Sequence, residues 1–310
     1  MKTFYIRAMR PEEAGEVATL IFESTNAWYE ARGLGTIFGG DPEDCLLFPE
    51  VYEDLDPGHC LIAEGQDGAG ISASCFLHPR ETHLSLGIMN ARPGLEHRGA
   101  AKALLAEIIQ RAEEAGKPLR LVSSAFNLDS FSLYTRQGLN PYAVFQDLTL
   151  TVPEEGFRLD AVKDVSVRPA TVADVEAIDR LEREVWATSR KKDWGYFIEN
   201  ARKLWSVSVV DDGRGDLLGA LASVSHPASE MLGPGVARDS RTATALLVAE
   251  LNRRPGKSPV FLLPSDNREL VAFAYEELGA RNCELHLAQC LGETPEVRGV
   301  VMPTFMPETA

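Results

Sequence analysis

The amino-acid sequence predicts an α+β protein built from two similar halves, each a central mixed, mostly antiparallel sheet flanked by helices. Five segments of the first half recur in the second half in the same order, and ordered repetition indicates a duplicated structural unit. In each half the apolar periodicity changes in the order strand, helix, antiparallel strands, helix, strand, helix, strand. That order is typical of an α+β fold around one sheet.

The first repeats are a strand with its helix and a hairpin. Residues 6–20, IRAMRPEEAGEVATL, align with residues 167–181, VRPATVADVEAIDRL, in a branched residue, an arginine, an acidic residue and the apolar helical positions. Residues 64–79 and 211–227 each place an Asp-Gly or Gly-rich turn between alternating segments and end in His-Pro. Such turns between alternating segments favour a β-hairpin.

The later repeats predict a helix, a buried strand and a second helix in each half. The matching segments are 102–116 with 244–256, 119–124 with 260–265, and YTRQG at 134–138 with YEELG at 275–279. The offset between the halves falls from 161 (residue 167 against residue 6) to 141 (residue 275 against residue 134), so the first half holds about twenty additional residues. Residues 152–165 predict a linker, which gives domains 1–155 and 156–310.

The composition excludes several classes of protein. No stretch approaches the roughly 18 consecutive apolar residues of a membrane span, and the first residues lack a secretory signal pattern, so we expect a cytoplasmic protein with no membrane contact. The five cysteines form no C-x-x-C pair, and we expect reduced thiols and no metal site. A net charge of −15 disfavours binding to nucleic acid.

Two motifs resemble those of the GNAT superfamily N-acetyltransferases. ARPGLEHRGAAKALL at 91–105 resembles the family pattern V-x-P-x-x-[QR]-x-x-G-x-[GA]-x-A-L-L, with Glu96 in the Gln or Arg position. NLDSFSLYTRQGL at 127–139 meets every position of N-x-x-[AS]-x-x-L-Y-x-x-x-G-[FL]. In the second half Arg241 replaces the motif glycine, so the resemblance implies tandem GNAT-like domains of which the first is catalytic and the second structural.

The resemblance implies that acetyl-CoA pairs with the strand at 84–93 and places its pyrophosphate at the following helix start, where free N–H groups and the helix dipole attract anions. The alternative is a helix start whose small residues only pack against the sheet. The implied cofactor-binding residues are Met89, Asn90, Ala91, His97, Arg98, Gly99, Ala100, Ala101, Lys102, Asn127 and Ser130.

In the family an amine attacks the thioester directly, and Tyr134 stands at the general-acid position. His83 or Glu81 is the candidate base, acting through water, because imidazole titrates near neutral pH. Residues 24–59 are rich in acidic residues and contain Trp28 and Tyr29. Acidic and aromatic side chains together suit a cationic small-molecule or peptide amine as the acceptor. The alternative is a solvated acidic loop.

Other functions remain open at this stage. A non-catalytic acyl-CoA-binding or regulatory protein would account for Glu96 and for the altered second half. A related tandem fold could also transfer aminoacyl or longer acyl groups. The sequence does not identify the acceptor, and we expect a monomer or a homodimer.

Overall fold

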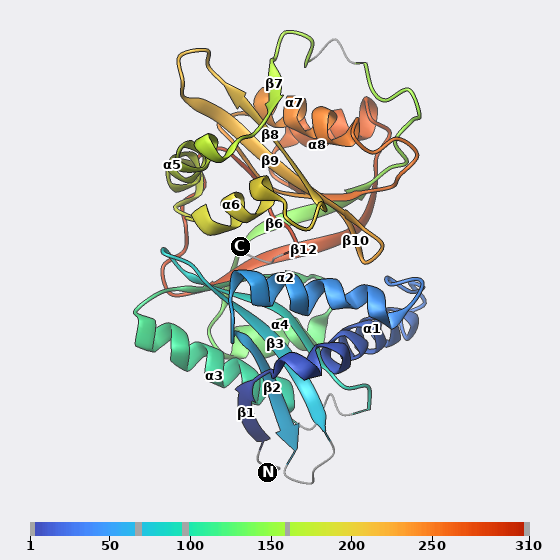
Figure 1. Cartoon of the computed structure of the whole chain (residues 1–310), viewed down its shortest axis with the longest axis vertical. Helices are drawn as coiled ribbons and strands as arrows, with labels where there is room; N and C mark the ends of the chain where they lie inside the picture. The colour runs from blue at the N-terminus through green and yellow to red at the C-terminus, as the bar shows by residue number, and fades with distance from the viewer. Residues whose placement is uncertain (1–3, 66–69, 95–98, 159–161, 307–310) are drawn as a thin grey trace. The chain divides into compact units, whose positions relative to one another are not determined.

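The computed structural model describes residues 4–65, 70–94, 99–158 and 162–306. Within these limits the chain forms two compact units (Figure 1). Unit 1 contains residues 4–79 and 83–119, and unit 2 contains residues 80–82 and 120–306. Both combine a sheet with flanking helices, which confirms the α+β class.

Unit 1 has an antiparallel sheet in the order β1-β2-β3-β4. Eight successive residues of β3 are buried, and because strand side chains alternate between faces, both faces of the sheet must be covered. Helices α1 and α3 both pack on β3 and supply this cover. The elements are β1 (Phe4–Ala8), α1 (Ala14–Glu30), α2 (Leu47–Leu55), β2 (Cys60–Gly65), β3 (Ile71–Pro79), β4 (Leu84–Ala91) and α3 (Ala100–Ala115), with 3-10 helices at Pro11–Glu13 and Pro42–Leu46.

Unit 2 has a mixed sheet in the order β5-β12-β6-β11-β10-β9-β8-β7, in which β10 and β11 are parallel and β13 pairs with β10. Its core lies between this sheet and α7 and α8, around Leu246, Phe261 and Leu270. The strands are β5 (Leu119–Ser124), β6 (Asn140–Thr149), β7 (Val167–Pro169), β8 (Trp205–Asp211), β9 (Leu217–His226), β10 (Ser229–Ala237), β11 (Val260–Pro264), β12 (Arg281–Leu291) and β13 (Val300–Met302). The helices are α4 (Leu128–Arg136), α5 (Val175–Trp186), α6 (Lys191–Glu199), α7 (Ser240–Leu251) and α8 (Arg268–Glu276), with a 3-10 helix at Val172–Asp174.

The element order repeats along the chain, but the last strand of the first series pairs with strands of the second. Strand β6 is antiparallel to β11 on one side and to β12 on the other. Just after β5, the Ala125 N–H donates to the carbonyl of Leu285 on β12 at 2.8 Å. The boundary between the compact units therefore falls near residue 120, well before the linker.

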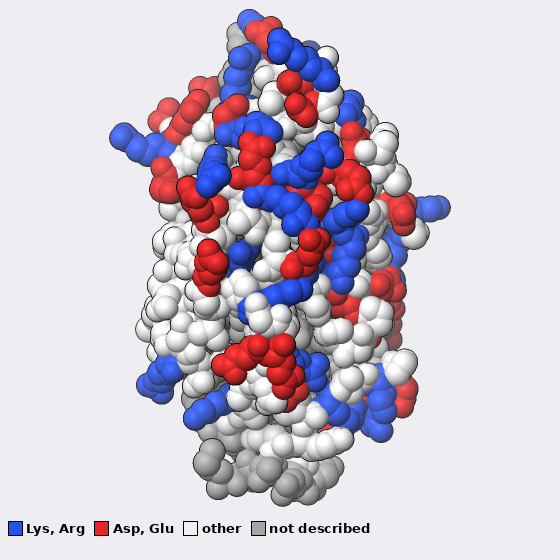
Figure 2. All heavy atoms as spheres, turned by 90° about the vertical axis from the view of Figure 1, so that its left-hand side faces the viewer, with Lys and Arg blue, Asp and Glu red and all other residues white. Residues whose placement is uncertain are grey.

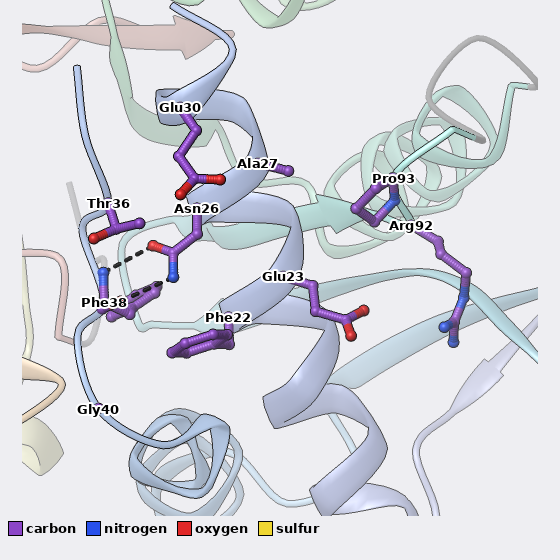
Figure 3. A pocket seen from close by; sticks show the side chains of 10 residues that line it. All are labelled: Phe22, Glu23, Asn26, Ala27, Glu30, Thr36, Phe38, Gly40, Arg92 and Pro93. Carbon is purple, nitrogen blue, oxygen red and sulfur yellow. Dashed lines mark hydrogen bonds between the residues drawn. The ribbon is translucent and has the colours of Figure 1, made fainter. Parts of the chain in front are cut away.

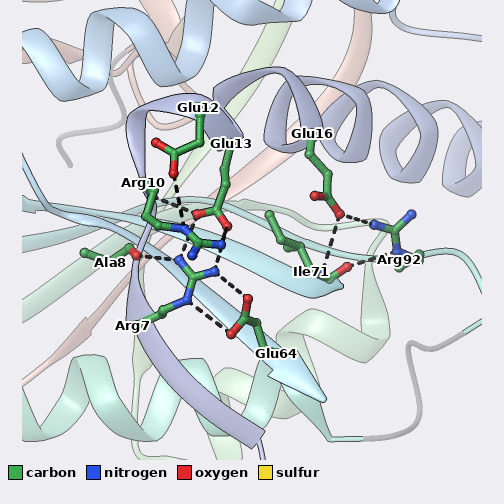
Figure 4. Close-up of polar contacts among 9 residues, drawn as sticks. All are labelled: Arg7, Ala8, Arg10, Glu12, Glu13, Glu16, Glu64, Ile71 and Arg92. Carbon is green, nitrogen blue, oxygen red and sulfur yellow. Dashed lines mark hydrogen bonds and ion pairs between the residues drawn. The ribbon is translucent and has the colours of Figure 1, made fainter. Parts of the chain in front are cut away.

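In each unit an arginine on the first strand forms ion pairs with an acidic residue just before the first helix and with another on the neighbouring strand. Arg7 on β1 donates to Glu13 at 2.8 Å and from Nε to Glu64 on β2 at 3.1 Å (Figure 4). This guanidinium holds the pKa of the Glu13 carboxyl well below its usual range. In unit 2 the equivalent residues are Arg168, Asp174 and Asp211. The arginine and acid shared by the two repeats thus have one structural role.

The charged surface is mixed in sign. On the face drawn in Figure 2, basic and acidic side chains alternate in small groups over the described residues. Among the helices that the structure describes, none is both long and apolar enough to cross a bilayer. On this face the described residues form no concentrated basic stripe of the kind on which phosphate-backbone binding depends.

Candidate active site

Strand β4 carries a β-bulge immediately before the predicted cofactor-binding residues. Leu86 pairs with Leu77 and Met89 pairs with Cys75, so β4 has one more residue than β3 between these two pairs. A bulge bends its strand and redirects the residues that follow. Residues 89–91 come directly after it and are half-buried, so their backbone is placed at a local break in a regular sheet.

The residues after β4 turn into helix α3 through a glycine in the left-handed conformation. Gly99 has φ +93° and precedes the helix, and its carbonyl accepts the N–H of Ala103 at 3.0 Å. A Cβ added at Gly99 would meet no described atom within 4 Å. Ala100, Ala101 and Lys102 form the first turn. His97, Arg98 and Glu96 lie outside the described residues.

A pocket of about 620 Å³ lies between α1, the segment at residues 36–40 and the end of β4 (Figure 3). Unit 1 supplies all of its lining, so the pocket does not depend on the second unit. The lining residues are Phe22, Glu23, Asn26, Ala27, Glu30, Thr36, Phe38, Gly40, Arg92 and Pro93.

The charge of this pocket is predominantly negative. Glu23 and Glu30 are exposed on α1, and among the described residues neither carboxylate forms a hydrogen bond or ion pair. Arg92, the basic residue of the lining, is already paired, since its Nη2 donates to Glu16 and its Nε to the carbonyl of Ile71, both at 2.9 Å (Figure 4). The two open carboxylates therefore favour a cationic occupant.

A buried asparagine on α1 holds the segment at residues 36–40, which forms one wall of the pocket. The Asn26 Oδ1 accepts the N–H groups of Ile37 at 3.0 Å and Phe38 at 2.9 Å, and its Nδ2 donates to the Phe38 carbonyl at 2.9 Å. The Phe38 ring packs on Phe22 and Phe48, with centroids 6.3 and 5.7 Å apart. This wall is therefore pre-organised before any acceptor binds.

The predicted acceptor residues lie on the same helix but outside the pocket lining. Trp28 and Tyr29 contact each other edge to face, with ring centroids 4.8 Å apart. The guanidinium of Arg32 lies 3.9 Å from the Trp28 ring centroid, so this aromatic face already holds a cation. The acidic residues at 23 and 30, which the sequence analysis did not single out, line the pocket instead. Their spacing of seven along one helix is the signal that could have found them.

The other predicted site residues that the structure describes are distributed over the two units. On α4 in unit 2, Asn127 is the N-cap and accepts the Ser130 N–H at 3.0 Å, and Tyr134 is 6% exposed. His83 in unit 1 is fully buried. Glu81 in unit 2 forms an ion pair with Arg183 at 2.6 Å.

Comparison with known proteins gives similarity in structure only. No protein-family model and no curated protein matches the sequence. A putative acetyltransferase from Pyrococcus horikoshii superposes with a TM-score of 0.74 at 13% identity, over 97% of this chain and 92% of the other. A GCN5-related N-acetyltransferase from Sphaerobacter thermophilus gives 0.64 at 18% identity, over 95% and 97%. A tandem GNAT protein from the clavulanic acid biosynthesis pathway gives 0.57 at 14% identity, over 94% and 100%.

The fold is that of the GCN5-related N-acetyltransferases, or GNATs. The predicted resemblance is thereby confirmed at the level of the fold.

The sheet of unit 2 contains a strand, β10, that resembles β4 in its bulge. Strand β10 has the same extra residue, since Leu232 pairs with Ser223 and Gly235 with Leu221. Residues 235–237 thus correspond to residues 89–91 of β4, and they pair with β13 along their length. Because β13 has three residues, it carries no usable sequence signal, and the sequence analysis missed it.

Proposed function

We propose that this chain transfers the acetyl group of acetyl-CoA to a cationic primary amine. The observation that carries the proposal is the acidic pocket beside the end of β4 in a GNAT fold. Two open carboxylates in a pocket whose walls are fixed suit an acceptor that brings at least one positive charge besides the reacting amine.

Cofactor binding is assigned to residues 89–91 and to the start of α3. The left-handed Gly99 stands directly before the first turn of that helix, and the unpaired N–H groups of a helix start bind phosphate oxygens well. Lys102 is exposed in the first turn and would add a positive charge. Bound acetyl-CoA would supply the thioester that reacts.

In the proposed reaction the amine nitrogen, in its unprotonated form, attacks the carbonyl carbon of the thioester. The new C–N bond forms, the C–S bond breaks, and the departing thiolate takes a proton from the Tyr134 hydroxyl. The proton that the nitrogen loses as the amide forms returns through solvent to the Tyr134 oxygen. The base that deprotonates the amine is Glu81 or His83. Since His83 is fully buried, its proton transfer would need a relay.

We further propose that the chain is a tandem GNAT with domains at 1–155 and 156–310, of which the first is catalytic. In the second, β13 covers the strand edge that corresponds to residues 89–91, and an edge already paired with protein backbone is closed to a cofactor. The second domain would then contribute β12 as a neighbour of β6.

The test measures CoA release from acetyl-CoA with a panel of monoamines, diamines and amino sugars. Glu23→Gln and Glu30→Gln should raise KM for diamines at least tenfold with kcat largely retained, because they remove binding shared by ground and transition states. The matched control is Glu113→Gln, an exposed glutamate on α3, which should change nothing. If acetyl-CoA binds but no amine is acetylated, the non-catalytic acyl-CoA-binding alternative replaces the proposal.

A further inference from the structure

Two neighbouring strands of unit 2 bring together three metal-ligating side chains that the proposed reaction does not use. Asp147 lies on β6, and Glu284 and His286 lie on β12. Glu284 is the direct cross-strand partner of Asp147, and His286, two residues further on, projects from the same face. One ligand atom from each side chain lies within 4.8 Å of the others.

These three side chains are buried. Asp147 is 2% exposed, and Glu284 and His286 are each 7% exposed. The imidazole Nδ1 of His286 lies 2.9 Å from the Asp147 Oδ1, and the hydroxyl of Ser124 donates to Glu284. Two carboxylates and one imidazole therefore present their donor atoms to one another within the protein interior.

A divalent cation bound at this point would interact with both carboxylates at once.

The donor set selects among cations. One imidazole nitrogen with two carboxylate oxygens suits zinc and similar first-row ions, while Mg²⁺ and Ca²⁺ prefer oxygen ligands alone. Ligands on a tetrahedral zinc ion with bonds of about 2.0 Å are about 3.3 Å apart. The 2.9 Å separation of His286 from Asp147 is close to that value, and rotation of the Glu284 side chain would complete three ligands.

We propose that Asp147, Glu284 and His286 bind one divalent transition-metal ion, with Zn²⁺ as the representative cation and a fourth position open to water. Ser124 orients Glu284 as an outer partner of the site. No local sequence motif predicts this site, because His286 and Asp147 are 139 residues apart in sequence.

The test uses the full chain, purified without a histidine tag and treated with chelator. Zn²⁺ is titrated calorimetrically, bound metal is counted by mass spectrometry, and Co²⁺ is added as a probe whose visible absorption reports its ligands. We expect one equivalent per chain. Asp147→Asn and His286→Gln should each weaken binding at least tenfold, and Ser124→Ala should weaken it about 10–100-fold, as loss of an outer partner does.

The matched control is Asp56→Asn in unit 1. It makes the same chemical change at another buried Asp–His pair, in which His78 Nδ1 lies 2.8 Å from Asp56 Oδ2, and it should leave metal binding unchanged. Absence of saturable Zn²⁺ and Co²⁺ binding by the wild-type chain overturns the proposal, and so does equal binding by His286→Gln. Thermal melts of the metal-free proteins identify any variant that is unfolded, in which case Glu284→Gln, the isosteric change at the third ligand, decides.

Discussion

A glutamate at position 99 should abolish cofactor binding and leave the fold intact. Gly99 adopts φ +93°, so any L-residue there costs about 1–2 kcal/mol of backbone strain. An added Cβ would clash with no described atom, and a carboxylate at a helix N-terminus gains about 0.3–1 kcal/mol from the dipole. The variant should therefore lose at most about 2 kcal/mol of stability while placing a negative charge against the incoming pyrophosphate.

The matched control is Gly116→Glu at the other end of α3. Gly116 also has a left-handed backbone, φ +62°, with no described atom within 4 Å of an added Cβ. A glutamate there meets the unfavourable end of the dipole, so this variant should be the less stable of the two.

The assay is thermal unfolding with and without acetyl-CoA. Ligand at 100 times its dissociation constant adds about 2.7 kcal/mol, a shift of several degrees. We expect the shift in wild type and Gly116→Glu and none in Gly99→Glu. An equal shift in both variants would refute the assignment of the cofactor to the start of α3.

Two further predictions concern chemistry and pH. Tyr134→Phe should lower kcat about 100-fold, at the low end of general acid catalysis, with cofactor affinity unchanged. The control is Tyr275→Phe, which removes a hydroxyl that donates to Gln146 at 2.5 Å and should retain full turnover. Equal rates for the two variants would remove Tyr134 from the mechanism. Arg168 lowers the pKa of Asp174 to about 2, below the unfolded value of about 3.9, so this carboxylate stabilises the fold above that value and the contribution is lost as pH falls toward 2. The difference in urea unfolding free energy between wild type and Asp174→Asn should therefore shrink from pH 6 to pH 3, and a constant difference would contradict the cause given.

The sequence predicted those elements whose signal is local. Residues 119–124 were expected as a strand and form β5 with the same bounds, because a short apolar run between a helix and a turn has few alternatives. Helix α2 was missed because residues 24–59 are rich in acidic and turn-forming residues, which obscured the amphipathic stretch at Leu47–Leu55. Phe48, Val51 and Tyr52 are buried on one face of this helix, and their burial depends on the neighbouring sheet, which the local sequence does not reveal.

The residues of the candidate site also divide into those with a local sequence signal and those without one. A motif identified Gly99, because a left-handed turn before a helix constrains the residue type. The pocket carboxylates at 23 and 30 were not singled out, since charge on an exposed helix face is usually solvated. Which of them face a cavity depends on how Asn26 holds the segment at 36–40, and no local pattern encodes a contact of that kind.

The pairing of β6 explains why a half without a complete cofactor motif is retained. Strand β6 belongs to the first half by sequence, yet both of its neighbours, β11 and β12, come from the second. A strand left without them would expose its N–H and C=O groups to nonspecific pairing. The structural role proposed for the second half would allow Arg241 in place of the motif glycine and the pairing of residues 235–237 with β13, because that role depends on backbone pairing, which tolerates changes in side chains.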